Sequence, residues 1–330
     1  MFIKKSKKKI FYISTFGKNP NSGIFYKQSL IYLKKKYIIE EVYFNFSITN
    51  LFRTIIKIIE INKKLTKQDI IHSQYGSGCG LIGLFLNGKK IISIRGSDLL
   101  NIGFSKDIQA FLKTLITKFY LRYYEKVIVM SNQLKTKVKK LNYNHKIYKI
   151  TDPIDSKKFY PMDMNLAKKK LGFFKDVNYI FYPLINNKSK EKNFALVQKI
   201  IKLFETHKKY KIIGANNKIK HSDMVYYYNA CRCIILTSIY EGWPNVVKEA
   251  IYCSTPIIST PVSDLSTISK KNTSLHIVDY LPMSFAKKII EICKKKNGHK
   301  KNKSFIYLKK LIDNMNMKYY LSKMSKVYGN

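Results

Sequence analysis

The chain has 330 residues, enough for about two domains that each bury a hydrophobic core. Its 62 Lys and Arg outnumber 20 Asp and Glu, which gives a formal net charge of +42. An apolar content of 45% and an aromatic content of 14% exclude a disordered chain, and no apolar run is long enough to span a bilayer.

The first half of the chain alternates short apolar runs with longer amphipathic segments. Residues 10–16 follow the basic residues 4–9 but are too short for the core of a signal peptide, so we expect them to begin the first strand. The apolar runs predict strands at residues 10–15, 38–44, 69–72, 90–94, 127–130 and 147–150. The amphipathic segments predict helices at residues 24–36, 51–65, 105–123 and 133–141.

The second half repeats this alternation. It predicts strands at residues 179–182, 211–213, 233–236, 256–259 and 275–278, and helices at 165–171, 191–207, 222–230, 245–252, 283–295 and 305–328. Strands that alternate with helices form parallel sheets, so we predict an α/β fold of two doubly wound, Rossmann-like domains that face each other across a cleft.

Pro153 and Pro161 interrupt the pattern between these two series. We therefore predict an N-terminal domain over residues 1–155 and a C-terminal domain over residues 156–304. Residues 305–330 are expected to form a final helix that packs back toward the N-terminal domain.

The positive charge does not by itself select a partner. Membrane headgroups, sugar nucleotides and nucleic acid would all be attracted. Arg occurs only four times, so 58 of the basic residues are Lys. A nucleic-acid-binding protein is expected to keep Arg for bidentate contacts with phosphate and guanine. The five scattered Cys residues indicate a reducing compartment, which predicts a cytoplasmic protein.

The segment with the most candidate functional residues follows the predicted strand at residues 233–236. It contains Glu241, then Gly242, which allows close approach of backbone to a ligand, then Pro244 and Asn245, which suit the start of a helix. A helix start offers free N–H groups for a phosphate. Glu249 lies in the same helix, so a carboxylate is expected on either side of this anion site. A carboxylate accepts hydrogen bonds from adjacent hydroxyls, as a sugar or ribose presents them.

Glu241 and Glu249 form the pattern Glu-x7-Glu, and residues 237–265 resemble the donor-binding segment of retaining GT-B glycosyltransferases of family four, the group 1 glycosyl transferases. Weaker similarities occur in the same order as in that family. They lie at residues 19–25 (Asn-Pro-Asn-Ser-Gly-Ile-Phe), 69–74 (Asp-Ile-Ile-His-Ser-Gln), 95–98 (Arg-Gly-Ser-Asp), 152–161 and 221–230.

The resemblance implies transfer of a sugar, with retention, from a nucleoside-diphosphate donor to a hydroxyl of a glycan or lipid-linked acceptor, as a hexosyltransferase does. It implies that Glu241 binds hydroxyls of the transferred sugar and that Glu249 binds the ribose. Lys192 lies where the family has a diphosphate-binding Lys, and Lys188 or Lys190 would replace the Arg that accompanies it. With 58 Lys in the chain, a chance Lys at such a position is as good an explanation.

Two further candidates come from the first half. Gly23, in the loop after the first strand, would approach the donor phosphate or the acceptor, although Asn-Pro-Asn also suits an ordinary turn. Arg95 stands at the position of the family's fourth-strand His, which is often followed by Gly, and we assign it to the catalytic site as a ligand for phosphate or an acceptor anion. The alternative for Arg95 is a structural ion pair, for example with Asp98.

The sequence also departs from the family. Pro183 and Leu184 replace its Gly-Arg, and the stretch between Gly214 and His221 is short, which suggests a trimmed strand–helix unit. No Asp-x-Asp and no metal-ligand spacing of His occurs, so we expect neither a metal nor any other cofactor besides the nucleotide-sugar co-substrate.

The expected role is synthesis of a bacterial surface polysaccharide, on the inner face of the cell membrane, where basic and aromatic residues of the first half would favour peripheral contact with anionic lipid. We expect no nucleic-acid partner. Two alternatives remain: an epimerase of the same GT-B fold, which needs no acceptor, and a non-catalytic basic protein that binds nucleic acid.

Overall fold

A computed structural model describes residues 9–15, 24–45, 50–100, 108–183, 190–215, 219–269, 274–295 and 303–329. The chain divides into two compact units, one of residues 1–153 together with 317–330 and the other of residues 154–316. Each unit is an α/β structure built on its own parallel sheet. Among the described segments, none of the helices combines the length and the apolar character that a membrane span requires.

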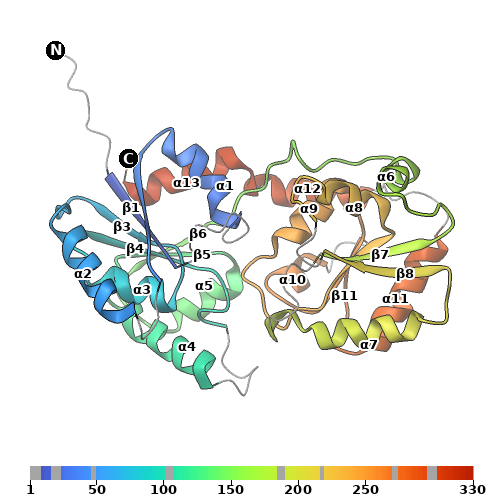
Figure 1. Ribbon diagram of the computed structural model, residues 1–330, viewed down its shortest axis with the longest axis horizontal. Coiled ribbons are helices and arrows are strands. Elements are labelled where there is room, and N and C mark those ends of the chain that lie inside the picture. Colours follow the sequence, from blue (N-terminus) through green and yellow to red (C-terminus); the bar gives the residue numbers. More distant parts are fainter. Residues whose placement is uncertain are drawn as a thin grey trace, which may run out of the picture. The chain divides into compact units, whose positions relative to one another are not determined.

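The sheet of the first unit has the strand order β2-β1-β3-β4-β5-β6, and every neighbouring pair is parallel (Figure 1). Its strands are β1 (Lys9–Ser14), β2 (Ile38–Tyr43), β3 (Ile70–Ser73), β4 (Lys89–Ile94), β5 (Lys126–Val129) and β6 (Lys146–Lys149). The central strands are covered on both faces and are therefore nearly continuous apolar runs, as the sequence indicated.

The helices of this unit are α1 (Ile24–Lys34), α2 (Leu51–Asn62), α3 (Ser77–Leu84), α4 (Ile108–Leu121), α5 (Asn132–Lys139) and α13 (Met317–Tyr328). Sequence analysis did not predict α3, because its sequence Ser-Gly-Cys-Gly-Leu-Ile-Gly-Leu has low helical propensity. Tertiary packing explains its glycines: a Cβ at Gly80 would overlap Tyr120 of α4, and a Cβ at Gly83 would overlap Tyr124. The Tyr124 hydroxyl donates to the Gly80 carbonyl at 2.6 Å, which fixes α3 on α4.

Helix α13 is joined to the sheet through a buried polar network. Nδ1 of His72, on β3, lies 2.8 Å from the Tyr328 hydroxyl, and its Nε2 lies 2.9 Å from Oγ of Ser93. The Tyr328 hydroxyl also lies 3.1 Å from that of Tyr12. Burial, reinforced by the charge of Arg95, lowers the pKa of His72 to about 3, so this histidine is neutral in the folded protein.

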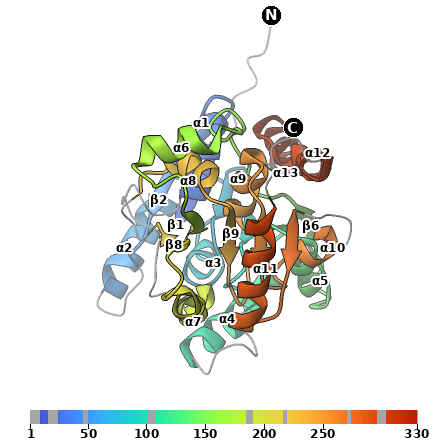
Figure 2. The same cartoon turned by 90° about the vertical axis from the view of Figure 1, so that its right-hand side faces the viewer.

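The sheet of the second unit has the order β11-β10-β9-β7-β8, again all parallel. Its strands are β7 (Asn178–Tyr182), β8 (Tyr210–Gly214), β9 (Cys233–Leu236), β10 (Ile257–Ser259) and β11 (Leu275–Ile277). Its helices are α6 (Met164–Leu171), α7 (Phe194–Phe204), α8 (Met224–Ala230), α9 (Asn245–Cys253), α10 (Leu265–Ser269), α11 (Pro282–Lys294) and α12 (Lys303–Ile312). Figure 2 shows α7 and α11 beside each other, and their apolar faces share one core cluster with the sheet.

The predicted helix at residues 305–328 is broken. Helix α12 belongs to the second unit and α13 to the first, with a 3-10 turn, Asp313–Met315, between them. The Asn316 side chain donates to the Asp313 carbonyl at 2.5 Å, and its own backbone is extended. Asn and Asp side chains compete with the helix for backbone groups, which explains the break.

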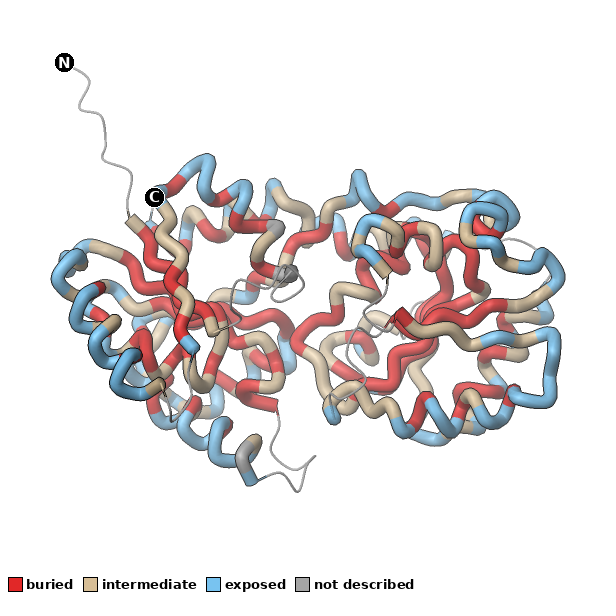
Figure 3. Tube along the Cα trace, in the orientation of Figure 1, coloured by how far each residue is buried: buried red, intermediate tan, exposed pale blue. Residues whose placement is uncertain are grey.

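Figure 3 shows that buried residues follow the strands of both sheets, whereas exposed residues lie on the outer helices. The predicted fold class, α/β with two doubly wound parallel sheets, is confirmed.

Candidate functional site

The strand order of the second unit brings two loops of the sequence together. Strands β7 and β9 are parallel neighbours, with Ile180 opposite Cys233 and Phe181 opposite Ile234. Their carboxyl ends therefore open at the same edge of the sheet. The short 3-10 helix η2 (Lys190–Lys192) lies after β7, and the segment with Glu241 lies after β9.

Hydrogen bonds tie these two loops to each other. The Thr237 hydroxyl donates to the Lys192 carbonyl at 2.9 Å, and the Ile239 amide donates to the Glu191 carbonyl at 2.8 Å. The Tyr182 hydroxyl, at the end of β7, also donates to the Lys192 carbonyl, at 3.3 Å. Three donors from two strand ends thus fix the backbone around Lys192.

This arrangement places Lys192 against Glu241. Nζ of Lys192 lies 2.5 Å from Oε1 of Glu241, and the Ser238 hydroxyl donates to the same oxygen at 2.8 Å. Burial alone would lower the pKa of Lys192, but the charges of Glu241 and Glu191 outweigh it and hold that pKa above its usual value. The Lys192 side chain keeps 27% of its surface exposed, so this ion pair is open to a ligand.

Glu249 lies at the start of the second turn of α9 and is almost fully buried. The Tyr228 hydroxyl donates to its Oε2 at 2.6 Å, and Nε2 of His221 lies 3.1 Å from its Oε1. Burial and the charge of Glu249 raise the pKa of Tyr228 well above its usual value, which keeps the phenol protonated as the donor. The hydrogen bond with Glu249 raises the pKa of His221 against the opposing effect of burial.

Phe159 completes the surroundings of Glu249. Its ring contacts His221 edge to face at 5.5 Å between centroids and Tyr228 at 6.0 Å. The sequence did not predict the roles of His221, Tyr228 and Phe159. His221 and Tyr228 lie seven residues apart at α8, whereas Phe159 comes from a distant segment of the chain. No local spacing signals their meeting, because α8, α9 and the strand-free segment before α6 converge only in the folded unit.

The start of α9 has two features that favour a ligand. Its N-cap residue is Pro244, whose side chain makes no capping hydrogen bond, so the positive end of the helix dipole lacks the acceptor that an N-cap residue usually supplies. Oδ1 of Asn245 is buried without a hydrogen-bond partner among the described residues. The Gly242 carbonyl, just before, accepts from the Ser263 hydroxyl at 2.6 Å, which fixes the loop that leads into the helix.

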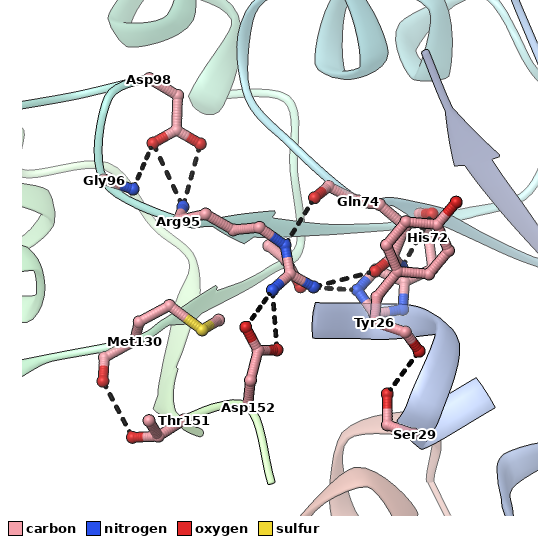
Figure 4. Close-up of polar contacts among 11 residues, drawn as sticks. Tyr26, Ser29, His72, Gln74, Arg95, Gly96, Asp98, Met130, Thr151 and Asp152 are labelled. Carbon is pink, nitrogen blue, oxygen red and sulfur yellow. Dashed lines mark hydrogen bonds and ion pairs between the residues drawn. The ribbon is translucent and has the colours of Figure 1, made fainter. Parts of the chain in front are cut away.

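In the first unit, the Arg95 guanidinium is bound on two sides (Figure 4). Its Nη1 contacts both carboxylate oxygens of Asp152, at 2.6 and 2.7 Å. Its Nε donates to the Gln74 carbonyl at 2.8 Å, and Nη2 donates to the Gln74 side chain at 3.2 Å. The Arg95 side chain is 8% exposed and that of Asp152 13% exposed. These contacts are those of a structural ion pair, while the catalytic role assigned to Arg95 stays a prediction.

The partner suggested for Arg95 in such an ion pair was wrong. Figure 4 shows the Asp98 carboxylate turned toward the backbone, where it accepts from the amides of Arg95 at 3.0 Å and Gly96 at 2.8 Å. The Gly76 amide donates to it at 2.9 Å. Burial raises the pKa of Asp98 despite these amide hydrogen bonds, which lower it. Asp98 therefore shapes the loop after β4, whereas Asp152 neutralises the guanidinium.

Among the predicted site residues, the structure brings Lys192 and Glu241 into contact and places Gly242, Pro244, Asn245 and Glu249 along the entry to α9 and its first turns. Gly23 and Lys188 lie outside the described residues. No group of three or more His, Cys, Asp or Glu in the described part of the chain is arranged to hold a metal ion.

Comparison with known families supports this assignment of the second unit. Residues 190–311 match the model of the family "Glycosyl transferases group 1". A comparison with curated proteins found no match.

Several solved structures have the same fold over nearly the whole chain. A sucrose-phosphate synthase from Thermosynechococcus elongatus has a TM-score of 0.75 at 16% identity, with 98% of each chain covered. A glycosyltransferase from Rickettsia africae has a TM-score of 0.69 at 17% identity, again with 98% of each chain covered. The Anabaena protein HepE, in complex with UDP and glucose, has a TM-score of 0.72 at 11% identity, with 97% of this chain and 99% of HepE covered.

These findings confirm the predicted GT-B fold and the predicted enzyme class. The chain has the GT-B fold of glycosyltransferases, and its second unit carries a group 1 glycosyltransferase domain.

Proposed function

We propose that the protein is a retaining hexosyltransferase that uses a nucleoside-diphosphate sugar as donor and a hydroxyl of a glycan or lipid-linked acceptor. The observation that carries the proposal is the Lys192–Glu241 pair, held at the shared edge of β7 and β9 and partly open to solvent. HepE was solved with UDP and glucose, which supports a nucleotide sugar as the donor here.

Glu241 and Lys192 bind different parts of the donor. The Glu241 carboxylate accepts hydrogen bonds from hydroxyls of the transferred sugar, and Ser238 holds its orientation. The bond between the sugar's anomeric carbon and the diphosphate breaks, a bond to the acceptor oxygen forms, and the proton of the acceptor hydroxyl passes to the departing diphosphate. The departing diphosphate gains negative charge. The Lys192 ammonium and the positive end of the α9 dipole stabilise that charge, and Lys188 or Lys190 adds a second cation.

Glu249 positions the nucleoside. Tyr228 occupies one of its oxygens from the buried side, so the oxygen beside His221 is the one that accepts a ribose hydroxyl. The diphosphate is balanced by lysine and helix N–H groups in this proposal, and neither a metal nor another cofactor takes part. Arg95 has no assigned step, since its guanidinium is bound by Asp152 and Gln74.

The proposed setting is synthesis of a surface polysaccharide or lipid-linked glycan in the cytoplasm, at the inner face of the cell membrane. The net charge of +42 supports it, because lysines near an anionic membrane surface each contribute about 1 kcal/mol of attraction.

Binding of UDP-, GDP- and CDP-sugars, measured by calorimetry and thermal unfolding, tests the donor site. A donor present at 100 times its dissociation constant should stabilise the protein by about 2.7 kcal/mol. Lys192→Met and Glu249→Gln should each remove most of this stabilisation. Lys288→Met is the matched control, because Lys288 forms an exposed ion pair with Glu291 on α11, away from the site.

A flat response of the wild-type protein across all three donors would refute the donor site. Product analysis then tests the reaction: sugar transfer requires an acceptor, and conversion of the donor into an epimer without one would identify an epimerase instead.

A further inference from the structure

Before its last two residues, the buried Tyr120 and Leu121, helix α4 has its polarity reversed relative to an ordinary surface helix. It buries the threonines Thr114 and Thr117, whose hydroxyls donate to the carbonyls of Ala110 and Lys113 at 3.0 and 2.7 Å. Its outward side carries a continuous series of large apolar side chains at helical spacing. These are Ile108, Phe111, Leu112, Leu115, Ile116 and Phe119, followed by Tyr123, each between 41 and 73% exposed.

Helix α2 repeats this reversal. Thr54 faces inward and is buried, whereas Phe52 is 74% exposed. The outward stripe consists of Leu51, Phe52, Ile55, Ile56 and Ile59. A soluble monomer rarely exposes contiguous apolar side chains on this scale, so two such helices in one unit indicate a binding surface.

The two helices lie on the same face of the first sheet. Figure 1 shows α2, α3 and α4 below the sheet, with α1 and α13 on its other side, and the view in Figure 2 agrees. Helix α3 links them. The Asn62 side chain of α2 donates to the Phe85 carbonyl just after α3 at 2.8 Å, and α3 packs on Tyr120 of α4 and on Tyr124, which follows α4. Phe85 is itself 60% exposed. We call the outward stripes of α2 and α4, together with Phe85, the apolar face.

Cations flank the apolar face. Helix α4 contains Lys113 and Lys118 and no acidic residue, and the exposed Arg122 follows it. The charges on Lys118 and Lys137 are close enough that Lys118 adds to the burial that lowers the pKa of Lys137 on α5. The positive region therefore continues from α4 to α5.

We propose that the apolar face docks the protein on an anionic lipid bilayer. Phe, Leu and Ile on one side of a helix with Lys and Arg beside them are typical of helices that lie in a membrane interface, where lysine side chains reach back to the headgroups. A bilayer accounts for both features together, because its interior takes up the apolar side chains and its anionic headgroups attract the flanking cations. The inference rests on the membrane setting proposed above but not on the transfer chemistry, so lipid binding and donor binding can fail separately.

Co-sedimentation with vesicles of pure phosphatidylcholine, and of phosphatidylcholine mixed with phosphatidylglycerol, tests the proposal on the full-length protein. Binding should require the anionic lipid and should weaken as the ionic strength approaches about 1 M, where the Debye length falls to about 3 Å. Equal binding to neutral and anionic vesicles, or binding to neither, would overturn the proposal.

Matched variants test whether vesicle binding depends on the apolar face or on exposed apolar side chains in general. Phe111→Ser, Leu115→Ser and Phe119→Ser combined should lower the partition coefficient on the order of a hundredfold, since each removes roughly fivefold of apolar transfer. The control combines Leu166→Ser, Phe174→Ser and Ile306→Ser, three comparably exposed positions of the second unit, and should bind like wild type. An unchanged far-UV circular dichroism transition confirms that the first unit of the α4 variant is folded, and donor binding confirms the same for the second unit of both variants.

Two outcomes would contradict the lipid as occupant. Equal loss of vesicle binding in the two triple variants would mean that the apolar face contributes no more than other exposed apolar side chains do. A wild-type dimer in solution that the α4 variant converts to a monomer would identify the apolar face as a contact between two copies of the chain.

Discussion

The contacts of Arg95 allow a direct test of whether this residue serves stability or chemistry. Asp152→Asn keeps the size of the side chain and removes its charge, which leaves the guanidinium without the carboxylate that it contacts at 2.6 and 2.7 Å. Both side chains are little exposed, at 8 and 13%, so solvent cannot replace the lost charge. Breaking one side of a buried ion pair costs about 3 kcal/mol. We expect the first unit to lose stability by about this amount.

The assay can follow the two units separately. The only tryptophan, Trp243, lies in the second unit, so its fluorescence reports that unit during chemical denaturation, whereas far-UV circular dichroism reports both. Asp152→Asn should shift the circular dichroism transition and leave the fluorescence transition in place. Glu40→Gln is the matched control, because its ion pair with Lys9 at 3.0 Å has side chains 40 and 35% exposed and is expected to contribute less than about 1 kcal/mol. A structural role of the Arg95–Asp152 pair is refuted if Asp152→Asn lowers the free energy of unfolding no more than Glu40→Gln does. Loss of activity at unchanged stability would instead support the catalytic role predicted for Arg95.

Three further predictions address other contacts. Tyr228→Phe leaves Oε2 of Glu249 without its buried donor, so calorimetry should show donor binding weakened by about tenfold, and unchanged affinity would contradict the role of this pair. The pKa of His72 falls from 6.5 to about 3 on folding, so the unfolded chain binds a proton more readily than the folded protein does. The free energy of unfolding should therefore fall by about 1.4 kcal/mol for each pH unit below pH 6.5. Urea titrations across this range should show that slope, and the His72→Gln variant should lack it. Gly80→Ala places a methyl group against Tyr120 and should lower the free energy of unfolding, measured by thermal denaturation, by about 2 kcal/mol. Unchanged stability would show that α3 can shift to make room.

The sequence predicted what depends on local pattern. Strand β9 begins and ends where its apolar run does, and the Glu-x7-Glu pattern marked α9 and its entry loop. The sequence placed Lys192 and Glu241 after strands, but their contact was not predicted, because it depends on β7 and β9 being neighbours in the sheet.

What the sequence did not predict depends on packing between distant segments. Helix α3 forms because its glycines accommodate Tyr120 and Tyr124, and this requirement leaves no periodic signal. The ion pair of Arg95 with Asp152 spans 57 positions, and the meeting of His221 with Glu249 spans 28. Charge and residue type alone made Asp98 as reasonable a partner for Arg95 as Asp152.

The place of α13 also affects how the protein is made. The first unit takes its core from both ends of a long stretch of chain, with Tyr328 closing over His72 and Tyr12 only after residues 154–316 have been synthesised. Domains usually fold as they emerge from the ribosome, but this unit then still lacks the partner of a buried histidine. Until α13 is made, only α1 among the described helices covers that side of the first sheet, and chaperones therefore have a defined period in which to act on the nascent chain.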